Sequence, residues 1–383
     1  MSSLRVQRWT EEQFASSRQA WQGLLERCDA DPLFMSWDWQ WNWWRHHAGY
    51  LRATLCVLAL YSASGELVGL APFYSHRVRL RGPLYTRRLE LIGLAWRRRE
   101  VVFSEYLDLL AAPEQAETVL AAVEEWLCAE RGWHEMLLCC TRERSLARRL
   151  TGGRLGGGSL VREVDPLRGY RVSLPANFEE YLRALPAATR RKAFHQRRKL
   201  SGAALVEAQP RQASEYLDAL AAFVANRWGG RGDGSGVESE LQRRFHLDLA
   251  AHFAGAGCLQ LTRLEAADGQ ALSVMYNVRA GATEYYLQSG FDAERSRGLS
   301  LGYLHLGYAI EGACAAGMVS FDFLGGEGRH RDYKRDFCTE SYLLVSYHLI
   351  RTHWLRILYG GYLALKRGGG GPHPDPPPPA DRL

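Results

Sequence analysis

Four side chains capable of acid–base chemistry fall within a short segment late in the chain: Asp322, Glu327, Tyr333 and Lys334. A carboxylate can remove a proton from a nucleophile, and a tyrosine hydroxyl can return a proton to a leaving group. A lysine ammonium can stabilise an oxyanion when it is held in place beforehand. We therefore expect these four residues to be catalytic, with the turn after Asp322 folding the other three back over the end of its strand.

Two roles stay open for Asp322. It lies in the short apolar run 319–324, where alternation puts it on the opposite face from Phe321 and Phe323. A carboxylate on such a strand can act as a proton acceptor. It can equally bind the backbone of the following loop and take no part in chemistry. The sequence favours neither role.

The elements that must position these side chains are a strand, a glycine-rich turn, a helix and a second strand. The first strand opens at Tyr285, and the turn 297–302 leads into a helix whose apolar residues follow a helical period. Gly317 ends that helix in the way a C′ glycine does. The N–H groups that open a helix lack intrahelical partners and attract anions. The pattern therefore predicts a phosphate site at the turn.

The turn and the second strand resemble a known family. The residues Arg297-Gly298-Leu299-Ser300-Leu301-Gly302 resemble the R/Q-x-x-G-x-G/A pyrophosphate loop of the GNAT acyl-CoA N-acyltransferases, with Ser300 in place of the first glycine. The run D-F-L-G-G-E at 322–327, followed by Y-K at 333–334, resembles the CelD-like branch of that superfamily, which is linked to polysaccharide biosynthesis. Fem-type peptidyl transferases share the tandem architecture. The resemblance covers most of residues 30–365 and is strongest over 170–340.

The resemblance implies an enzyme that moves an acetyl or other acyl group from acyl-CoA to an amine. The cofactor would lie against Gln288, Arg297, Gly298, Leu299, Ser300, Leu301 and Gly302. Similarity to Fem-type enzymes places a lysine such as Lys334 near the reacting carbonyl, and a tyrosine such as Tyr333 protonates the departing thiolate in several GNAT members. The implied acceptor is the amine of an amino sugar or another polysaccharide precursor. Aminoacyl transfer from tRNA to a cell-wall precursor stays open, as does a non-catalytic binding protein on the same fold.

The same order of predicted elements occurs twice, roughly two hundred residues apart. A hairpin, a strand, a helix and a second strand over 55–140 match the same elements over 259–324. Such internal repetition indicates a structural duplication. We predict an α+β fold of two tandem GNAT-like lobes, each a mixed sheet flanked by helices.

The two predicted lobes differ in their capacity for a cofactor. We place the first at 1–160 and the second at 170–366, because residues 151–169 are glycine-rich and polar. Glu114 and Glu117 open the helix of the first lobe, where they compete with any anion for the helix dipole. We therefore expect a degenerate first lobe and an acyl-CoA-binding second lobe. The Gly/Pro-rich segment 367–383 is predicted to be disordered.

A strongly basic stretch precedes the second set of elements. Arg190 and Arg191 recur seven positions later as Arg197 and Arg198, which predicts one broad basic face of a helix. These four arginines are the expected substrate-binding residues, for an anionic substrate or the CoA phosphate. A solvated face without a ligand is the alternative. Nucleic acid is disfavoured as a partner, because no aromatic residues are interleaved at stacking spacing.

Residues 31–47 are rich in tryptophan. Trp37, Trp41 and Trp44 fall at helical spacing, with Ser36 as the N-cap. These rings could form a platform for a sugar or an acyl chain. Aromatic stripes form core far more often, so we favour a helix packed on two sides.

The 383-residue chain has an ordinary globular composition, with 46% apolar and 23% charged residues and a net charge of +6. Its N-terminal residues lack the apolar centre of a signal peptide, and no apolar run has the length of a membrane span. Eight cysteines without a C-x-x-C pair favour a reducing compartment, so we expect a cytoplasmic protein. Histidine spacing predicts no metal site. The amphipathic helix predicted over 354–366 is expected to dock on the second lobe, with contact to a membrane surface as the alternative.

Overall fold

The computed structural model of the chain describes residues 4–80, 83–200, 202–228, 239–296, 298–326 and 333–367. Two compact units make up the chain. We call Met1–Arg98, Ser104–Pro166 and Leu344–Leu383 the first lobe, and Arg99–Phe103 with Leu167–Leu343 the second lobe.

The first lobe takes its elements mainly from the first half of the chain. Its strands are β1 (Arg5–Arg8), β2 (Thr54–Tyr61), β3 (Leu67–Arg79), β4 (Tyr85–Leu91), β5 (Leu110–Ala111) and β6 (Glu135–Thr141). Its helices are α1 (Glu11–Ser16), α2 (Arg18–Leu25), α3 (Trp37–Leu51), the 3₁₀ turn η1 (Pro113–Gln115), α4 (Ala116–Ala129), α5 (Leu146–Arg149) and α6 (Arg154–Gly157). The end of the chain adds β13 (Glu340–Ile350) and α12 (His353–Arg367).

The second lobe begins within β7 (Leu160–Ser173). Its other strands are β8 (Ala204–Glu207), β9 (Leu259–Glu265), β10 (Ala271–Ala280), β11 (Thr283–Phe291) and β12 (Ser320–Gly325). Its helices are α7 (Phe178–Ala184), α8 (Ala187–Ala193), α9 (Ala213–Trp228), α10 (Glu240–Gly255) and α11 (Leu301–Ala315), with the 3₁₀ turns η2 (His195–Lys199), η3 (Pro210–Gln212) and η4 (Tyr333–Asp336).

Strand order repeats in the two lobes and confirms the predicted duplication. The first lobe orders its strands β1-β2-β3-β4-β6-β13, and the second β8-β9-β10-β11-β12-β7. In each lobe three antiparallel pairings are followed by one parallel pair, β4 with β6 or β11 with β12. A parallel pair needs a crossover connection, which α4 supplies in the first lobe and α11 in the second.

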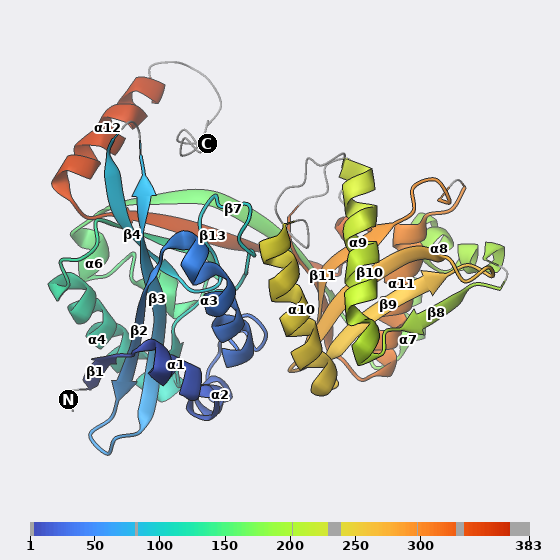
Figure 1. Ribbon diagram of the computed structural model, residues 1–383, viewed down its shortest axis with the longest axis horizontal. Coiled ribbons are helices and arrows are strands. Elements are labelled where there is room, and N and C mark those ends of the chain that lie inside the picture. Colours follow the sequence, from blue (N-terminus) through green and yellow to red (C-terminus); the bar gives the residue numbers. More distant parts are fainter. Residues whose placement is uncertain are drawn as a thin grey trace. The chain divides into compact units, whose positions relative to one another are not determined.

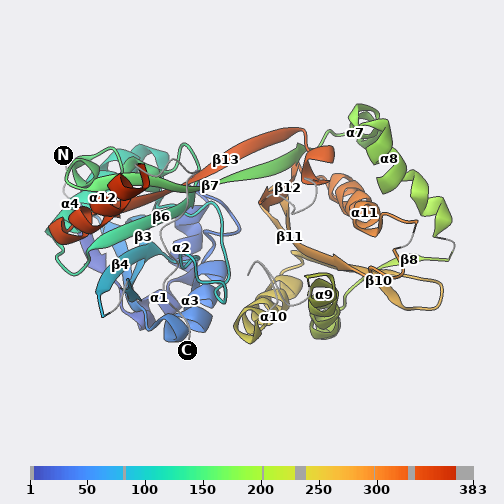
Figure 2. The ribbon, with the colours of Figure 1, turned by 90° about the horizontal axis from the view of Figure 1, so that it is seen from above.

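Helices cover both faces of each sheet (Figures 1 and 2). In the second lobe, α9 and α10 lie on one face while α8 and α11 lie on the other (Figure 2). In the first lobe, α2 and α3 lie on one face while α4 and α12 lie on the other (Figure 2). Each lobe is therefore an α+β layered unit with its own core.

The tryptophan-rich helix α3 belongs to that core. The Oγ of Ser36 accepts a hydrogen bond from the N–H of Trp39 at 3.2 Å, which confirms the predicted N-cap. Trp39 and Trp43 are buried, and the indole of Trp39 donates to the Oγ of Ser104 at 2.8 Å. Packing rather than ligand binding explains these rings.

The lobe boundaries differ from the predicted ones. Leu355 of α12 packs with Ile350 and Leu80, so the last helix docks on the first lobe and not on the second. The glycine-rich segment 151–169 is not a loop either, because it contains α6 and the start of β7. A Cβ at Gly169 would meet the ring of Tyr342, so this glycine allows close packing rather than flexibility. The predicted disordered tail lies outside the described residues.

Three general features of the described residues bear on function. The eight cysteines are free thiols, three of them buried and five partly buried. No described helix has the length and apolarity needed to cross a membrane. Within the same residues, no three His, Cys, Asp or Glu side chains gather where a metal ion could be held.

Candidate functional site

β11 and β12 separate after a short stretch of pairing. Parallel pairing covers residues 283–285 and 320–322 and ends with Tyr285 opposite Asp322, after which β11 continues as a partner of β10. A register shift against β10 leaves Leu287 as an extra residue in β11. Such a bulge bends a strand and strengthens its twist. The two strands therefore separate beyond Tyr285 and Asp322, and we call the place where they separate the opening.

The amino terminus of α11 lies beside the opening. Gly302 in its first turn is close to Phe291, the last residue of β11, because a Cβ at Gly302 would be 3.5 Å from that ring. Gly298 has a φ of 77°, which glycine adopts readily. Ser300 is the N-cap but makes no side-chain cap, and its N–H donates to the Oε1 of Gln196 at 3.1 Å. The first turn of α11, whose N–H groups lack intrahelical partners, thus lies close to the end of β11.

The remaining predicted cofactor residues have different surroundings. Gln288 lies in β11 immediately after the bulge, opposite Tyr276, and is partly buried. The side chain of Leu301 is buried in a small apolar cluster with Leu304, so only its backbone can reach a ligand. Arg297 lies outside the described residues.

A small pocket adjoins the turn before α11. Its volume is about 290 Å³, and its lining includes Lys199, Arg295 and Leu299. Arg295 also pairs with Asp268 at 3.1 Å, which neutralises part of its charge. Two cations beside an apolar wall are suited to a phosphate with an organic substituent.

Tyr333 contacts β11 just beyond its pairing with β12. Its hydroxyl is 3.1 Å from the hydroxyl of Tyr286 on β11, which is in turn 2.6 Å from the Oγ of Ser289. These three hydroxyl groups form a chain along the separated part of β11. Tyr333 is therefore placed where it can give a proton to a group bound in the opening.

Lys334 is fixed to the end of the other strand. It is buried, and its Nζ donates to the carbonyl oxygens of Leu324 at 3.3 Å and Gly325 at 3.0 Å. The prediction that the turn brings Lys334 back over the end of β12 is confirmed. Glu327, predicted beside it, lies outside the described residues.

Asp322 has its hydrogen-bonding capacity largely occupied by the fold. One carboxylate oxygen accepts from the Nε and Nη2 of Arg171 at 3.1 and 3.0 Å. The other accepts from the hydroxyl of Tyr342 at 2.7 Å and from the N–H of Leu324 at 2.8 Å. A fully buried carboxylate held in this way is poorly placed to take a proton from a substrate. The geometry favours the second of its two roles, as a brace.

What Asp322 braces is a bend in β12. Leu324 has a φ of 60°, which is uncommon for a residue other than glycine, and β12 shifts register against β7 between Asp322 and Gly325. Asp322 holds the N–H of Leu324, while Lys334 holds its carbonyl. Strained residues persist only where their surroundings fix them, and they cluster at functional sites.

The basic stretch does not form one helix, which corrects the prediction. α8 ends at Ala193, Phe194 departs from helical geometry with a φ of −124°, and the 3₁₀ turn η2 follows. The two basic pairs therefore lie on different elements. The seven-residue spacing misled because it assumes uninterrupted α-helix.

The four arginines of that stretch also divide by environment. The Nη1 of Arg190 donates to two carbonyls at the end of α7, both at 3.1 Å. Arg197 pairs with Glu311 at 2.6 Å and lies 3.7 Å from the ring centroid of Tyr308. Arg191 and Arg198 are exposed. Two of the four predicted substrate contacts are thus engaged within the lobe.

Several residues near the opening escaped the sequence analysis. Tyr286 and Ser289 read only as part of a strand, although a tyrosine and a serine three positions apart beside a bulge could have been noted. The hydroxyl of Tyr303, in the first turn of α11, donates to Asp336 at 2.6 Å. The ammonium of Lys192 lies 4.6 Å from the same ring. No local pattern connects these residues, because they come from separate elements.

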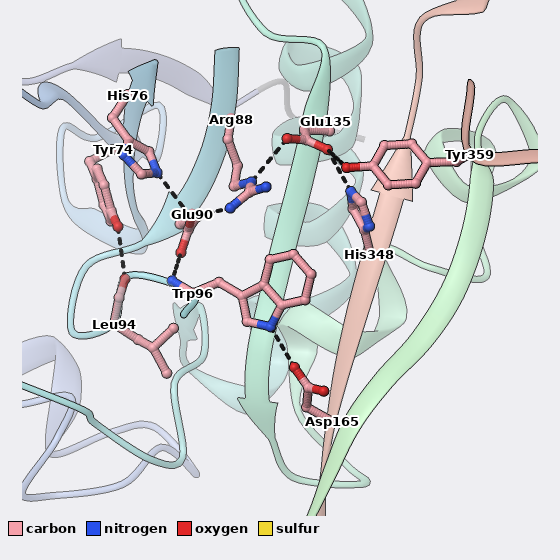
Figure 3. Close-up of polar contacts among 10 residues, drawn as sticks. All are labelled: Tyr74, His76, Arg88, Glu90, Leu94, Trp96, Glu135, Asp165, His348 and Tyr359. Atoms are coloured by element: carbon pink, nitrogen blue, oxygen red, sulfur yellow. Dashed lines mark hydrogen bonds and ion pairs between the residues drawn. The ribbon is translucent and has the colours of Figure 1, made fainter. Parts of the chain in front are cut away.

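The equivalent region of the first lobe is filled. β4 pairs with β6 over residues 88–90, and the chain then returns so that Trp96 lies across β4 and β13 (Figure 3). The N–H of Trp96 donates to Glu90 at 2.8 Å, and its indole donates to Asp165 at 2.6 Å. Its ring centroid is 5.8 Å from that of His348. Protein side chains thus occupy the place of an opening.

Residues 187–335, which contain the opening with α11 and most of its surrounding residues, match the acetyltransferase (GNAT) domain family. The chain carries a GNAT domain. No curated protein matches the sequence.

Similarity to solved structures extends over the whole tandem arrangement. FemX superposes with a TM-score of 0.58 at 12% identity, covering 92% of this chain and 99% of that one. A conserved protein of unknown function from Bacteroides thetaiotaomicron gives 0.54 at 13% identity, covering 91% and 99%. The C-terminal domain of a lysylphosphatidylglycerol synthetase candidate from Agrobacterium fabrum gives 0.50 at 14% identity, covering 93% and 96%. The chain therefore shares the tandem fold of FemX over most of its length.

Proposed function

We propose that this GNAT chain is an acyl-CoA-dependent N-acyltransferase whose second lobe binds the acyl-CoA. The opening between β11 and β12, with the amino terminus of α11 beside it, carries the proposal. The N–H groups of that helix, with Lys199 and Arg295 nearby, provide donors and positive charge for the phosphates of CoA. The separated strands provide an edge along which the pantetheine arm can extend.

The reaction needs few protein groups, because a thioester is already activated. A neutral amine attacks the thioester carbon, forming the C–N bond and an oxyanion; collapse then breaks the C–S bond and releases the CoA thiolate. Lys334 stabilises the oxyanion, and Tyr333 gives its proton to the thiolate. The amine loses its proton to a carboxylate. Because Asp322 is engaged as a brace, we favour Glu327 over Asp322 for this step.

The acceptor follows from the CelD-like resemblance, which suggests the amine of an amino sugar or another polysaccharide precursor in the cytoplasm. Similarity to FemX supports a second candidate, aminoacyl transfer from tRNA to a cell-wall precursor. A donor test separates the two, because only the first requires acyl-CoA. A non-catalytic binding protein would bind CoA without turnover.

Calorimetric titration of the full chain with CoA tests the cofactor site. Gly298→Asp and Ser300→Glu place a carboxylate beside the phosphates and should abolish binding. Gly298→Asn and Ser300→Gln are matched controls, because they impose the same backbone and steric demands without charge. Equal affinity across all four variants would refute the assignment of the loop.

Turnover with acetyl-CoA and a panel of amino sugars tests the reacting groups. Tyr333→Phe and Lys334→Met should lower turnover by about 10² or more while CoA affinity stays near that of the parent. Glu327→Gln should lower turnover by about 10²–10⁴. Parental turnover in all three variants would place the chemistry elsewhere.

A further inference from the structure

The first lobe contains a cavity that the proposed reaction does not use. Its volume is about 410 Å³, and it lies against β2, β3 and β4 beneath the carboxyl end of α4. Its lining includes Arg8, Arg52, Arg77, Arg87, Trp126 and Trp133. Four arginines and two tryptophans thus surround one cavity.

The positive charge of this cavity is not balanced by the fold. Arg8, Arg52, Arg77 and Arg87 are exposed, and within the described residues none of them forms an ion pair with a carboxylate. Arg77 and Arg87 lie directly opposite each other on β3 and β4, a placement that like charges disfavour. The single acid of the lining, Glu130, accepts a backbone N–H at 2.6 Å. A concave cluster of this kind attracts an anion.

α12 presents an apolar stripe on its outer side. Trp354, Ile357 and Leu358 are 41%, 63% and 45% exposed and lie at helical positions i, i+3 and i+4. Leu355 and Tyr359, on the inner side, are buried against the lobe. A helix that is apolar on two sides is normally covered on both.

The stripe and the cavity are neighbours. The N–H of Arg87 donates to the Nδ1 of His134 at 3.2 Å, and the ring of His134 is 6.2 Å from that of Trp354. Figure 1 shows α12 beside the ends of β3 and β4. At that end Tyr85 is 44% exposed, with the guanidinium of Arg77 at 4.7 Å from its ring centroid. Cationic and apolar groups are thus interleaved on one part of the lobe.

We propose that this part of the first lobe docks on an anionic membrane surface. The arginine cavity receives the phosphate of a lipid headgroup, while the stripe of α12 enters the interface between headgroups and acyl chains. Basic residues beside an exposed apolar helix face are the combination that binds such surfaces. A soluble phosphate would account for the cavity but would leave the stripe in water. The proposal is independent of acyl transfer.

Co-sedimentation of the full chain with vesicles tests the proposal. Vesicles of phosphatidylcholine with phosphatidylglycerol should bind the chain, and vesicles of phosphatidylcholine alone should bind it much more weakly. Arg77→Gln with Arg87→Gln should weaken binding by roughly tenfold or more, and high salt should have a similar effect. Ile357→Ser with Leu358→Ser should also release the chain, with less dependence on salt.

Matched variants control for charge and hydrophobicity in general. Arg144→Gln with Arg211→Gln removes the same charge from exposed positions elsewhere, and Leu205→Ser with Leu343→Ser removes exposed apolar side chains elsewhere. Both pairs should bind anionic vesicles like the parent, and every variant should keep the parental unfolding temperature and CoA affinity. The proposal is overturned if the control pairs weaken binding equally. It is also overturned if inorganic pyrophosphate binds the cavity while vesicles do not, or if the stripe joins two copies of the chain in sedimentation equilibrium.

Discussion

The two lobes use the same scaffold down to an irregularity in one strand. β6 shifts register against β13 near Cys140, which has a φ of 53°, and β12 shifts register against β7 near Leu324, which has a φ of 60°. The bend lies three residues after the last parallel-paired residue in β6, Leu137, and two residues after it in β12, Asp322. The bend therefore belongs to the scaffold, and it does not by itself make a site.

What differs between the lobes is the chain that follows β4 in the first lobe and β11 in the second. In the second lobe β11 continues past the parallel pair to Phe291, and a turn with Gly298 leads to a helix with no acid in its first turn. In the first lobe β4 stops at Leu91, and the returning chain inserts Trp96. α4 follows η1, and its first-turn Glu117 pairs with Arg149 at 2.6 Å. One returning segment therefore decides whether this scaffold is open or filled.

Each lobe also has a buried carboxylate paired with an arginine, and the two arginines differ in their exposure to solvent. Glu135 in the first lobe is inaccessible and bonded to Arg88 at 3.0 Å and His348 at 2.7 Å (Figure 3). Burial alone would raise the pKa of Glu135, but Arg88 and His348 together lower it to about 2. Arg171, the partner of Asp322, is about one-third exposed. The filled lobe therefore depends more on its internal charges.

The largest expected effect is on the stability of the first lobe. Glu135→Gln leaves Arg88 buried without a full counter-charge, which should cost about 3–5 kcal/mol in the free energy of unfolding. Urea denaturation of the full chain, followed by tryptophan fluorescence, measures it. A loss below about 1 kcal/mol would show that water or neighbouring groups compensate and that the pair is not central.

Asp322→Asn should cost less, about 1–3 kcal/mol, because Arg171 can reach water when its partner is removed. The same variant separates the two roles of Asp322. If Asp322 is a brace, the turnover of Asp322→Asn should fall only in proportion to the loss of folded protein and should recover at low temperature. A general base predicts a loss of about 10²–10⁴ in turnover at unchanged stability, which would contradict the structural assignment.

Much of the repeat could be predicted because it is encoded locally. The helix predicted between the turn 297–302 and Gly317 is α11 (Leu301–Ala315), and Gly317 has a φ of 73° just beyond its end. The matching helix of the first lobe ends without such a signal, because α4 stops at Ala129 and the next glycine, Gly132, has no positive φ. Local signals thus locate elements better than they explain their ends.

The contacts of the site could not be predicted, because they join segments far apart in the sequence. Asp322 meets Arg171 across 151 positions, and Tyr333 meets Tyr286 across 47. Which lobe the final strand joins depends on the pairing of β13 with β6, and nothing within β13 specifies that partner. The sequence identified the reactive side chains Tyr333 and Lys334, but not the hydroxyl chain and the carbonyls that hold them.

A third prediction concerns Asp108 of the first lobe, a buried acid bonded to backbone N–H groups rather than to an arginine. It accepts from Leu109 at 2.7 Å and Ala147 at 2.8 Å, and burial raises its pKa from 3.8 to about 7. The folded state then holds this proton more tightly than the unfolded chain does. The contribution to stability is full below about pH 4 and is lost as the pH rises through about 7, with a slope of up to about 1.4 kcal/mol per pH unit.

Asp108→Asn can accept the same two hydrogen bonds without titrating. The difference in the free energy of unfolding, variant minus parent, should therefore become more positive as the pH rises from about 4 to 7. Urea denaturation at a series of pH values measures the difference between the two proteins. Glu294→Gln, at an exposed position of the second lobe, is the control and should follow the parent. Parallel curves for Asp108→Asn and the parent would show that the carboxyl is ionised in the fold.

The smallest expected effects concern the basic residues of the second lobe. Some of these side chains bind the backbone of the lobe, and others are exposed and free to contact a substrate. Arg190 caps two carbonyls at the end of α7, and those carbonyls have no intrahelical donor. Arg190→Gln should therefore cost about 0.5–1.5 kcal/mol in the free energy of unfolding. Arg191→Gln, one position along and exposed, should stay within about 0.5 kcal/mol of the parent.

Kinetics of the same two variants then decide whether any part of the basic stretch serves an acceptor. If the exposed arginines contact an anionic acceptor, Arg191→Gln raises the KM for that acceptor. The difference in KM between the variant and the parent then becomes smaller at high salt, because salt screens the same attraction in the parent. Arg190→Gln, whose guanidinium is committed to α7, changes KM little at temperatures where it stays folded. The opposite assignment, with KM altered by Arg190→Gln alone, would mean that α7 itself positions the acceptor. A salt-independent KM in both variants would leave the exposed pair as a solvated surface, and the acceptor would then have to be held at the opening.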